Sequence, residues 1–169
     1  FSVIPLQRDF YNANLRYTKE RTVVIISDAM RYEVGQELFA RMQDDPKCTA
    51  KLSVQLSVLP SYTRLGMAAL LPHKTLEMTD DFQVLVDGIL CDNLAGRQQV
   101  LQSYNPDSVC VQFDDIKNLK VAELRDVLTK RQIIYVYHNQ IDARGDKANT
   151  EDEVFNAGEE AVQEIMDLI

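Results

Sequence analysis

The sequence predicts an α/β domain with a mostly parallel sheet. Three continuous apolar runs rich in β-branched residues, at 22–27, 108–113 and 133–138, are typical of strands buried on both faces of such a sheet. Segments with apolar residues at helical spacing follow the first run and separate the other two. Strands that alternate with helices indicate crossover connections, which join parallel strands. The length of 169 residues favours one domain with a sizeable core.

The composition excludes several classes of protein. Hydrophobic residues make up 46% and charged residues 26% of the chain, so collagen-like, low-complexity and disordered classes fit poorly. The net charge of −8 predicts a surface that repels nucleic acid and anionic membranes unless a local group binds phosphate. The 3 cysteines are far apart and only 2 histidines occur, which excludes a zinc finger or a cysteine-rich metal site. Without a membrane-length apolar run or a signal peptide, we expect a cytoplasmic protein with no membrane contact.

The elements expected in the first half follow from local patterns. Residues 1–20 mix polar and aromatic types and predict an arm or linker. Beyond the first strand, apolar residues at helical spacing predict a helix over 31–43. Alternation of apolar with polar residues over 51–59 predicts a strand with one solvated face. Pro60 ends that strand, and the apolar segment 65–71 predicts a short helix.

The second half begins less regularly and then returns to alternating strands and helices. Residues 74–86 predict a hairpin with Asp80 and Asp81 in its turn. A polar loop is expected after the strand at 133–138. Further helices are expected over 92–104, over 119–130 and from about Glu151.

Both ends of the sequence suggest a piece of a longer protein. The first residue is Phe1 rather than Met, and the final helix stops at Ile169 without the Gly, Asn or Pro that commonly follows a helix. The start of that helix is marked by Thr150 and Glu153, which have the spacing of a capping box. We therefore expect residues 21–169 to form the N-terminal part of a domain.

Oxygen-bearing side chains follow the ends of predicted strands. In an open α/β sheet, ligands bind at the carboxyl ends of the strands. Asp28 follows the first strand, Thr63 stands at the start of the short apolar helix, and two carboxylates, Asp142 and Asp146, follow the last strand. Carboxylates crowded at one edge repel one another unless a cation lies between them, so the pattern indicates a divalent metal. Each residue also has a purely structural alternative, as a helix cap or a turn former.

Three longer motifs carry a resemblance. The segments VVIISDAMRYEVGQEL, LPSYTRLGMAALLPH and YVYHNQIDARGD occur in this order, each around a predicted strand end. They resemble the signatures of the PglZ domain, a branch of the alkaline phosphatase superfamily found in bacterial BREX and Pgl phage-defence systems. The resemblance covers about residues 20–169. It implies a three-layer α/β sandwich with a two-metal site for phosphoryl or phosphodiester transfer, usually with zinc.

The resemblance also implies roles for individual residues. Asp28 resembles the first metal-ligand aspartate of the superfamily, and Thr63 resembles the nucleophile that also binds metal. Asp142 resembles the aspartate of a D-x-x-G-H element that binds the second metal, but Asp146 stands where that element has histidine. A carboxylate there makes the site richer in oxygen and shifts its preference towards Mn or Mg. The other superfamily ligands, an Asp-His pair and a further histidine, are expected downstream.

Four further residues near these motifs are candidates for binding substrate. Arg31 and Arg64 lie close to the candidate ligands, and a guanidinium group matches phosphate oxygens bidentately. His138 and Asn139 directly follow the last strand and are candidates to bond the substrate or to orient a ligand. The alternatives are that both arginines are ordinary surface residues and that the histidine is structural.

The leading hypothesis is a metal-dependent phosphatase or phosphodiesterase, including the possibility of a nuclease. We expect it to act on a phosphate ester and to work with other phage-defence proteins, with DNA a candidate partner of the full-length parent. The 169-residue chain by itself is expected to be inactive and to leave its metal sites empty. The rival hypothesis is an interaction module that keeps the phosphatase fold without chemistry. A receiver-like domain also has aspartates at strand ends, but it is set aside because the last strand leads into HNQIDARGD rather than to a lysine.

Overall fold

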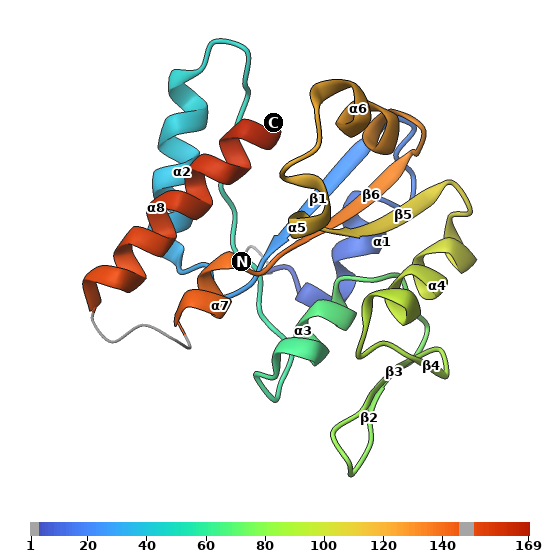
Figure 1. Cartoon of the computed structure of the whole chain (residues 1–169). Coiled ribbons are helices and arrows are strands. Elements are labelled where there is room, and N and C mark those ends of the chain that lie inside the picture. Colours follow the sequence, from blue (N-terminus) through green and yellow to red (C-terminus); the bar gives the residue numbers. More distant parts are fainter. Residues whose placement is uncertain (1–3, 146–150) are drawn as a thin grey trace. The chain divides into compact units, whose positions relative to one another are not determined.

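The computed structural model describes residues 4–145 and 151–169 (Figure 1). The chain divides into two compact units. The first comprises Phe1–Ile26 and Val54–Val136, and the second comprises Ser27–Ser53 and Tyr137–Ile169. Each unit is described here by itself.

The main sheet has three strands. Strand β1 (Thr22–Ser27) pairs with β6 (Ile133–His138), which pairs with β5 (Ser108–Gln112). The N–H of Thr22 donates to the carbonyl of Gln132 at 2.8 Å, and the N–H of Asp28 donates to the carbonyl of His138 at 2.9 Å. Both strands advance by the same number of residues between these two bonds, so they run parallel. The α/β class and the parallel sheet are therefore confirmed, and β6 is buried along its whole length as a central strand should be.

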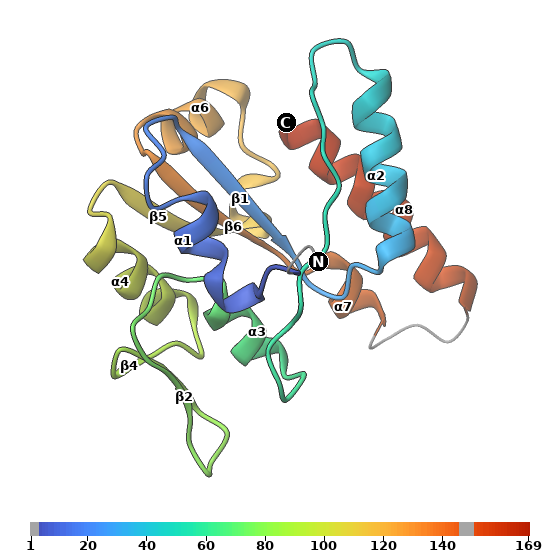
Figure 2. The ribbon, with the colours of Figure 1, turned by 180° about the vertical axis from the view of Figure 1, so that it is seen from behind.

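Helices of the first unit lie on both faces of this sheet. Helices α5 and α6 lie on the side nearer the viewer in Figure 1, whereas α1 lies on the side nearer the viewer in Figure 2. Helices α4 and α5 pack against β5, and the hydroxyl of Tyr135 in β6 donates to the carbonyl of Leu70 at 2.7 Å, just after α3. The helices of this unit are η1 (Gln7–Asp9), α1 (Phe10–Asn14), α3 (Thr63–Ala69), α4 (Leu94–Tyr104), α5 (Phe113–Ile116) and α6 (Val121–Thr129).

A small antiparallel sheet also belongs to the first unit. It contains β2 (Leu76–Met78), β3 (Val84–Val86) and β4 (Ile89–Leu90), in that order. Strands β2 and β3 form the predicted hairpin. The second hairpin was not predicted; its two-residue loop has Asp87 at φ 50° and Gly88 at φ 80°, both in the left-handed region. An Asp-Gly pair suits such a loop because both residues tolerate positive φ.

The second unit contains the last residues of β1 and β6 and the helices that follow these strands along the chain. Helix α8 (Glu151–Leu168) packs against α2 (Tyr32–Asp44) and α7 (Gln140–Gly145). The predicted polar loop after His138 is wrong over α7, where burial of Ile141 gives the polar segment an apolar anchor. The predicted capping residue Thr150 lies outside the described residues.

The predicted strand over 51–59 is wrong. Only Leu56 pairs, with Leu6 in a single parallel bridge. The apolar side chains that alternate along this segment do not bury a face; Val54 is 58% and Leu56 is 53% exposed. Alternation indicates a strand only where a partner strand and a core exist to receive one face.

Residues 4–20, which fall in the expected arm, contain η1 and α1. Tyr11 is 5% and Leu15 is 3% exposed, so this segment contributes to the core of the first unit. Hydrogen bonds also connect this segment to residues 58 and 66. The Gln7 side chain donates to the Gly66 carbonyl at 3.2 Å and accepts from the Val58 N–H at 3.0 Å.

Candidate functional site

Two candidate metal ligands follow neighbouring strands. Asp28 comes directly after β1, and Asp142 lies in α7, shortly after β6. Both residues belong to the second unit and both are half-buried. Because β1 and β6 are parallel and adjacent, the chain leaves the sheet towards both carboxylates at the same edge.

The turn after β1 holds Asp28 in an unusual backbone segment. Ala29 has φ 59°, in the left-handed region that costs an alanine roughly 1 kcal/mol. The Ala29 N–H also donates to Asp28 Oδ1 at 3.0 Å. Strained backbone of this kind persists where the surrounding structure fixes it, and it occurs often at functional sites.

His138 is buried and has both ring nitrogens engaged. Nδ1 lies 2.9 Å from the Ser27 hydroxyl, and Nε2 lies 2.9 Å from Glu164 Oε2. The side chain has 0% exposure. These contacts favour the structural alternative for His138 over direct bonding to a substrate. Sequence reasoning missed Ser27 and Glu164, because no local motif connects residues so far apart in the chain.

Thr63 and Arg64 belong to the first unit. Thr63 is the first residue of α3, a helix of 7 residues, and its side chain is exposed. Arg64 is 51% exposed and pairs with Asp92 at 3.5 Å, while Asp92 also accepts the N–H of Val84 at 3.1 Å. Thr63 and Arg64 thus belong to one unit, and Asp28 and Asp142 belong to the other.

The remaining predicted site residues lie at the surface or outside the description. Arg31 is exposed and immediately precedes α2, and its carbonyl accepts the N–H of Gly35 at 3.1 Å. Asn139 is exposed between β6 and α7. Asp146 lies outside the described residues.

The donor set can be compared with what divalent cations require. Among the residues whose side chains the structure describes, 4–143 and 156–169, no group of three His, Cys, Asp or Glu is arranged to hold a metal ion. Asp28 and Asp142 supply oxygen only, and the nitrogens of His138 are already used. Catalytic zinc usually has three protein ligands including nitrogen, whereas Mg²⁺ keeps several waters and needs only one or two carboxylates. The two aspartates therefore fit part of an oxygen-rich site and do not fit a complete zinc site.

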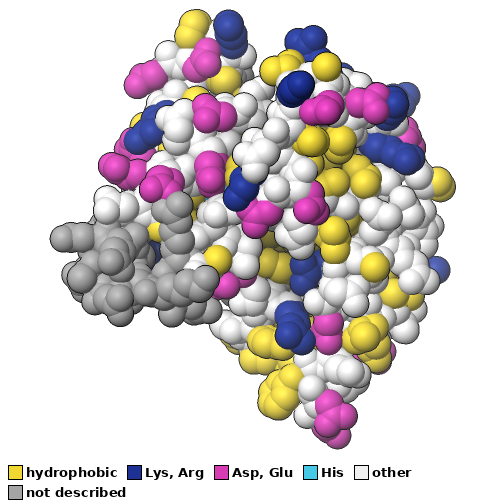
Figure 3. Space-filling model, in the orientation of Figure 1, with side chains coloured by type: hydrophobic (Ala, Val, Ile, Leu, Met, Phe, Trp, Pro, Cys, Tyr) yellow, Lys and Arg dark blue, Asp and Glu magenta, His cyan; other side chains and the backbone are white. Residues whose placement is uncertain are grey.

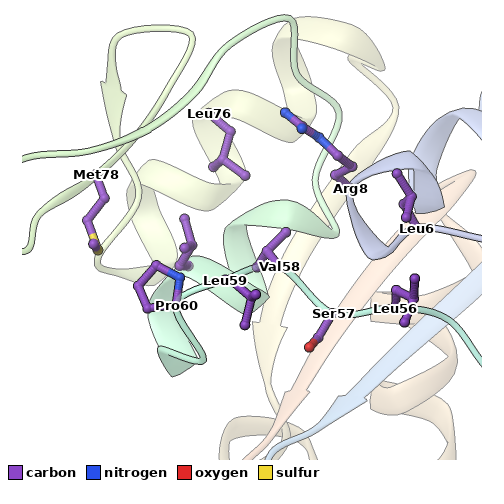
Figure 4. Close-up of a pocket in the computed structure, with 10 residues that line it drawn as sticks. Leu6, Arg8, Leu56, Ser57, Val58, Leu59, Pro60, Leu76 and Met78 are labelled. Atoms are coloured by element: carbon purple, nitrogen blue, oxygen red, sulfur yellow. The ribbon is translucent and has the colours of Figure 1, made fainter.

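An apolar pocket in the first unit was not predicted. It has a volume of about 450 Å³. Figure 4 shows Leu76 and Met78 of the hairpin on one side and Leu6 and Leu56 on the other, with Val58 and Leu59 between them. The exposed alternating segment 51–59 was its only signal in the sequence. The lining residues are Leu6, Arg8, Leu56, Ser57, Val58, Leu59, Pro60, Leu65, Leu76 and Met78.

Comparison with known families decides the assignment. Residues 9–169 match the family of the BREX system PglZ alkaline phosphatase-like domain. The chain belongs to the PglZ family. This confirms the resemblance drawn from the three motifs, and the family match covers every candidate site residue.

Two relatives of this PglZ chain have curated names. The alkaline phosphatase-like protein BrxZ of Escherichia coli O9:H4 (strain HS) is 40% identical over 173 aligned residues, which cover 98% of this chain and 20% of that protein. The alkaline phosphatase-like protein PglZ of Bacillus cereus (strain H3081.97) is 40% identical over 151 residues, which cover 89% of this chain and 18% of that protein. The chain thus spans about a fifth of the length of these relatives. No solved structure matches it significantly.

Part of the surface of this PglZ-family chain is acidic, as its net charge of −8 predicts. Acidic side chains gather over α2 and α8 in Figure 3. Such a face repels phosphate-rich polymers rather than binding them. No described helix combines the length and the apolar character needed to cross a membrane.

Proposed function

We propose that the chain supplies part of the site of a metal-dependent phosphoric ester hydrolase, a phosphatase or phosphodiesterase with Thr63 as the nucleophile. The observation that carries the proposal is the placement of Asp28 and Asp142 after two adjacent parallel strands. Membership of an alkaline phosphatase-like family supports the reaction class. The left-handed backbone at Ala29 supports a functional role for the turn that carries Asp28.

The chemistry follows from the residue types. When bound, a divalent cation lowers the pKa of a coordinated hydroxyl and neutralises charge on the phosphate. Asp28 and Asp142 would hold such ions through their carboxylates, with Mn or Mg favoured by the oxygen donors and zinc favoured by the resemblance. The Thr63 hydroxyl gives its proton to solvent and its oxygen forms a bond to phosphorus, while the bond from phosphorus to the ester oxygen breaks and the alcohol leaves with a proton from solvent. Water then cleaves the phosphothreonine, which releases phosphate and restores the hydroxyl.

The two arginines serve substrate binding in this proposal. Arg64 neighbours Thr63 and keeps donor groups besides the one paired with Asp92, because a guanidinium has five N–H groups. Arg31 lies three residues beyond Asp28 and is exposed. Each is suited to bind non-bridging oxygens of a phosphate ester.

The setting of the reaction is also proposed. The protein would work in the cytoplasm together with other proteins of a BREX or Pgl system. The family description, which names the BREX system, and the names of the two relatives support the second part of this proposal. DNA is a candidate substrate of the full natural polypeptide rather than of the acidic face over α2 and α8.

A non-catalytic interaction module is the second candidate. The observation that favours it is the apolar pocket beside the exposed segment 54–59, together with the lack of a three-ligand group among the described residues. A retained fold with a lost site would show these features and no turnover.

Hydrolysis by the full natural polypeptide that contains these 169 residues separates the two candidates. We expect turnover of a chromogenic phosphate monoester or diester that disappears with a chelator and returns with Mn²⁺, Mg²⁺ or Zn²⁺. Asp28→Asn and Asp142→Asn should each lower the rate by orders of magnitude. Asp80→Asn, in the exposed hairpin turn, is the matched control and should leave the rate unchanged. No turnover by the wild-type polypeptide, with or without added metal, would favour the interaction module. Turnover that does not need metal, or equal rates in all three variants, would contradict the roles proposed for Asp28 and Asp142.

A further inference from the structure

The buried contacts around His138 form a chain of three side chains from three elements. Ser27 ends β1, His138 ends β6 and Glu164 lies in the last part of α8. The two distances are both 2.9 Å, one to each ring nitrogen. All three residues belong to the second unit. From this geometry we infer that Ser27, His138 and Glu164 form a positioning network that fixes Asp28 for cation binding, an inference that rests on the proposed function.

The proton positions in the network follow from what each group can donate. A carboxylate only accepts, so the proton between Nε2 and Glu164 is carried by the ring. When the ring is neutral, Nδ1 is an acceptor and the Ser27 hydroxyl donates to it; when the ring is protonated, Nδ1 donates to the Ser27 oxygen. In both forms the ring holds the side chain of Ser27, the residue that directly precedes Asp28. Loss of Ser27 or Glu164 removes a contact from one nitrogen of the buried His138 ring, and a lost hydrogen bond to a buried polar group is costly.

A second contact connects the same histidine to Asp28. The backbone carbonyl of His138 accepts the Asp28 N–H at 2.9 Å. His138 thus holds Ser27 through its ring and Asp28 through its main chain. Asp28 is followed by the left-handed Ala29, a conformation that needs fixed surroundings to persist. The network supplies such surroundings on the strand side of the turn.

The network holds Asp28 in position and takes no direct part in the reaction. Both nitrogens of His138 are occupied inside the protein and its side chain has 0% exposure, so the ring offers nothing to a substrate. Glu164 has 29% side-chain exposure, and its described contact is to the ring. Outer groups of this kind typically change metal affinity or activity by roughly 10-fold to 100-fold when they are removed.

The test substitutes the two ends of the network in the full natural polypeptide. His138 itself is not changed, since loss of its ring would leave a cavity in the core. Ser27→Ala and Glu164→Ala each remove one contact. Glu164→Gln keeps an oxygen that can accept from Nε2 and is the conservative rescue. Glu159→Gln, exposed on the same helix, is the matched control.

Two readouts are needed, amide hydrogen exchange of the peptide that contains residues 22–30 and the Mn²⁺ concentration for half-maximal hydrolysis. We expect Ser27→Ala and Glu164→Ala to speed exchange in this peptide, and to raise the Mn²⁺ requirement by roughly 10-fold with little change in KM for the ester. Glu164→Gln and Glu159→Gln should behave like wild type. Unchanged exchange and Mn²⁺ requirement in folded Ser27→Ala and Glu164→Ala would overturn the inference. So would a Glu164→Gln variant as impaired as Glu164→Ala.

Failure of the proposed function would give a different result from failure of this inference. A wild-type polypeptide without any metal-dependent turnover would remove the hydrolase proposal. The exchange readout would then still decide whether the network fixes the turn at Asp28, because it does not depend on activity.

Discussion

The amide N–H of Asp28 donates to the carbonyl oxygen of His138 at 2.9 Å. Asp28 is the first residue after β1 and His138 is the last residue of β6, so this bond continues the parallel pairing to the point where both strands end. The segments that carry Asp28 and Asp142 therefore leave the sheet from paired positions. Any shared role of these two carboxylates depends on this pairing.

The close packing around Gly96 predicts that a side chain at this position lowers the stability of the protein. A Cβ atom at this position would lie 1.8 Å from the carbonyl oxygen of Leu90, a backbone atom that cannot move aside easily. Gly96→Ala should therefore lower the free energy of unfolding by about 3 kcal/mol, at the upper end of the usual cost of overpacking. Denaturant unfolding of the two proteins measures the difference.

Gly35 provides the matched control for this substitution. It lies inside α2, and a Cβ atom there would meet nothing within 4 Å. Gly35→Ala should raise the free energy of unfolding by about 0.5–1 kcal/mol, since alanine is the better helix former. Equal effects of the two substitutions would show that the close approach of Gly96 to Leu90 is not present in solution.

Local sequence patterns predicted an element correctly where the pattern of apolar residues matches the burial of those residues in the fold. Strand β6 is apolar along its length and is buried along its length, so its sequence was sufficient. The segment 51–59 has an equally regular pattern but lacks a partner strand, which the pattern cannot reveal. Helix α7 was missed because one buried apolar residue, Ile141, anchors an otherwise polar stretch.

Part of the candidate site could likewise be predicted from the sequence, whereas part of it depends on the fold. The rule that ligands gather at strand ends predicted Asp28 and Asp142 as candidate ligands, and the structure places them after two adjacent parallel strands. Their binding of metal stays a prediction. The contacts of His138 with Ser27 and Glu164 span 111 and 26 residues of sequence, and only the fold brings them together. Whether Thr63 acts with the two carboxylates stays a prediction.

The hydrogen bonds that Asp87 accepts predict that the free energy of unfolding depends on pH. Burial alone would raise the pKa of its carboxyl group, but hydrogen bonds from the Tyr104 hydroxyl and from two backbone amides outweigh burial and lower the pKa below 3.8. A carboxyl group whose pKa is lowered by folding stabilises the protein above its ordinary pKa, and this contribution is lost as the pH falls through the lowered value. We expect wild type to be more stable than Asp87→Asn near neutral pH and this advantage to shrink below about pH 3.8.

The substitution Asp87→Asn removes the charge and keeps the backbone conformation, because asparagine also tolerates the left-handed φ of 50° at this position. It also removes one acceptor, since an amide nitrogen cannot accept from the Tyr104 hydroxyl, so the change of the stability difference with pH is what reports the charge. Asp80→Asn removes one exposed charge from the neighbouring turn and is the control. Unfolding free energies across the acid range provide the measurement. A difference between wild type and Asp87→Asn that is constant with pH, or that grows as the pH falls, would contradict the lowered pKa.

The 169-residue chain alone should bind divalent metal weakly and hydrolyse no phosphate ester. Asp28 and Asp142 offer only oxygen, and the described residues hold no group of three potential ligands. Calorimetric titration with Zn²⁺ and Mn²⁺ tests this directly. Stoichiometric binding of micromolar or tighter affinity, or metal-dependent turnover by this chain, would show that further ligands exist within it.

The central claim is that Thr63 is the nucleophile of a metal-dependent phosphoric ester hydrolase. Its side chain is exposed at the start of α3, so Thr63→Ala should change the free energy of unfolding by no more than about 0.5 kcal/mol. Thr63→Ser keeps the hydroxyl and serves as the control. The decisive measurement is the metal-dependent rate of phosphate ester hydrolysis by the full natural polypeptide with Thr, Ser or Ala at position 63. We predict that Ala lowers the rate by orders of magnitude while Ser retains much of it; an undiminished rate in the folded Ala variant would contradict the claim.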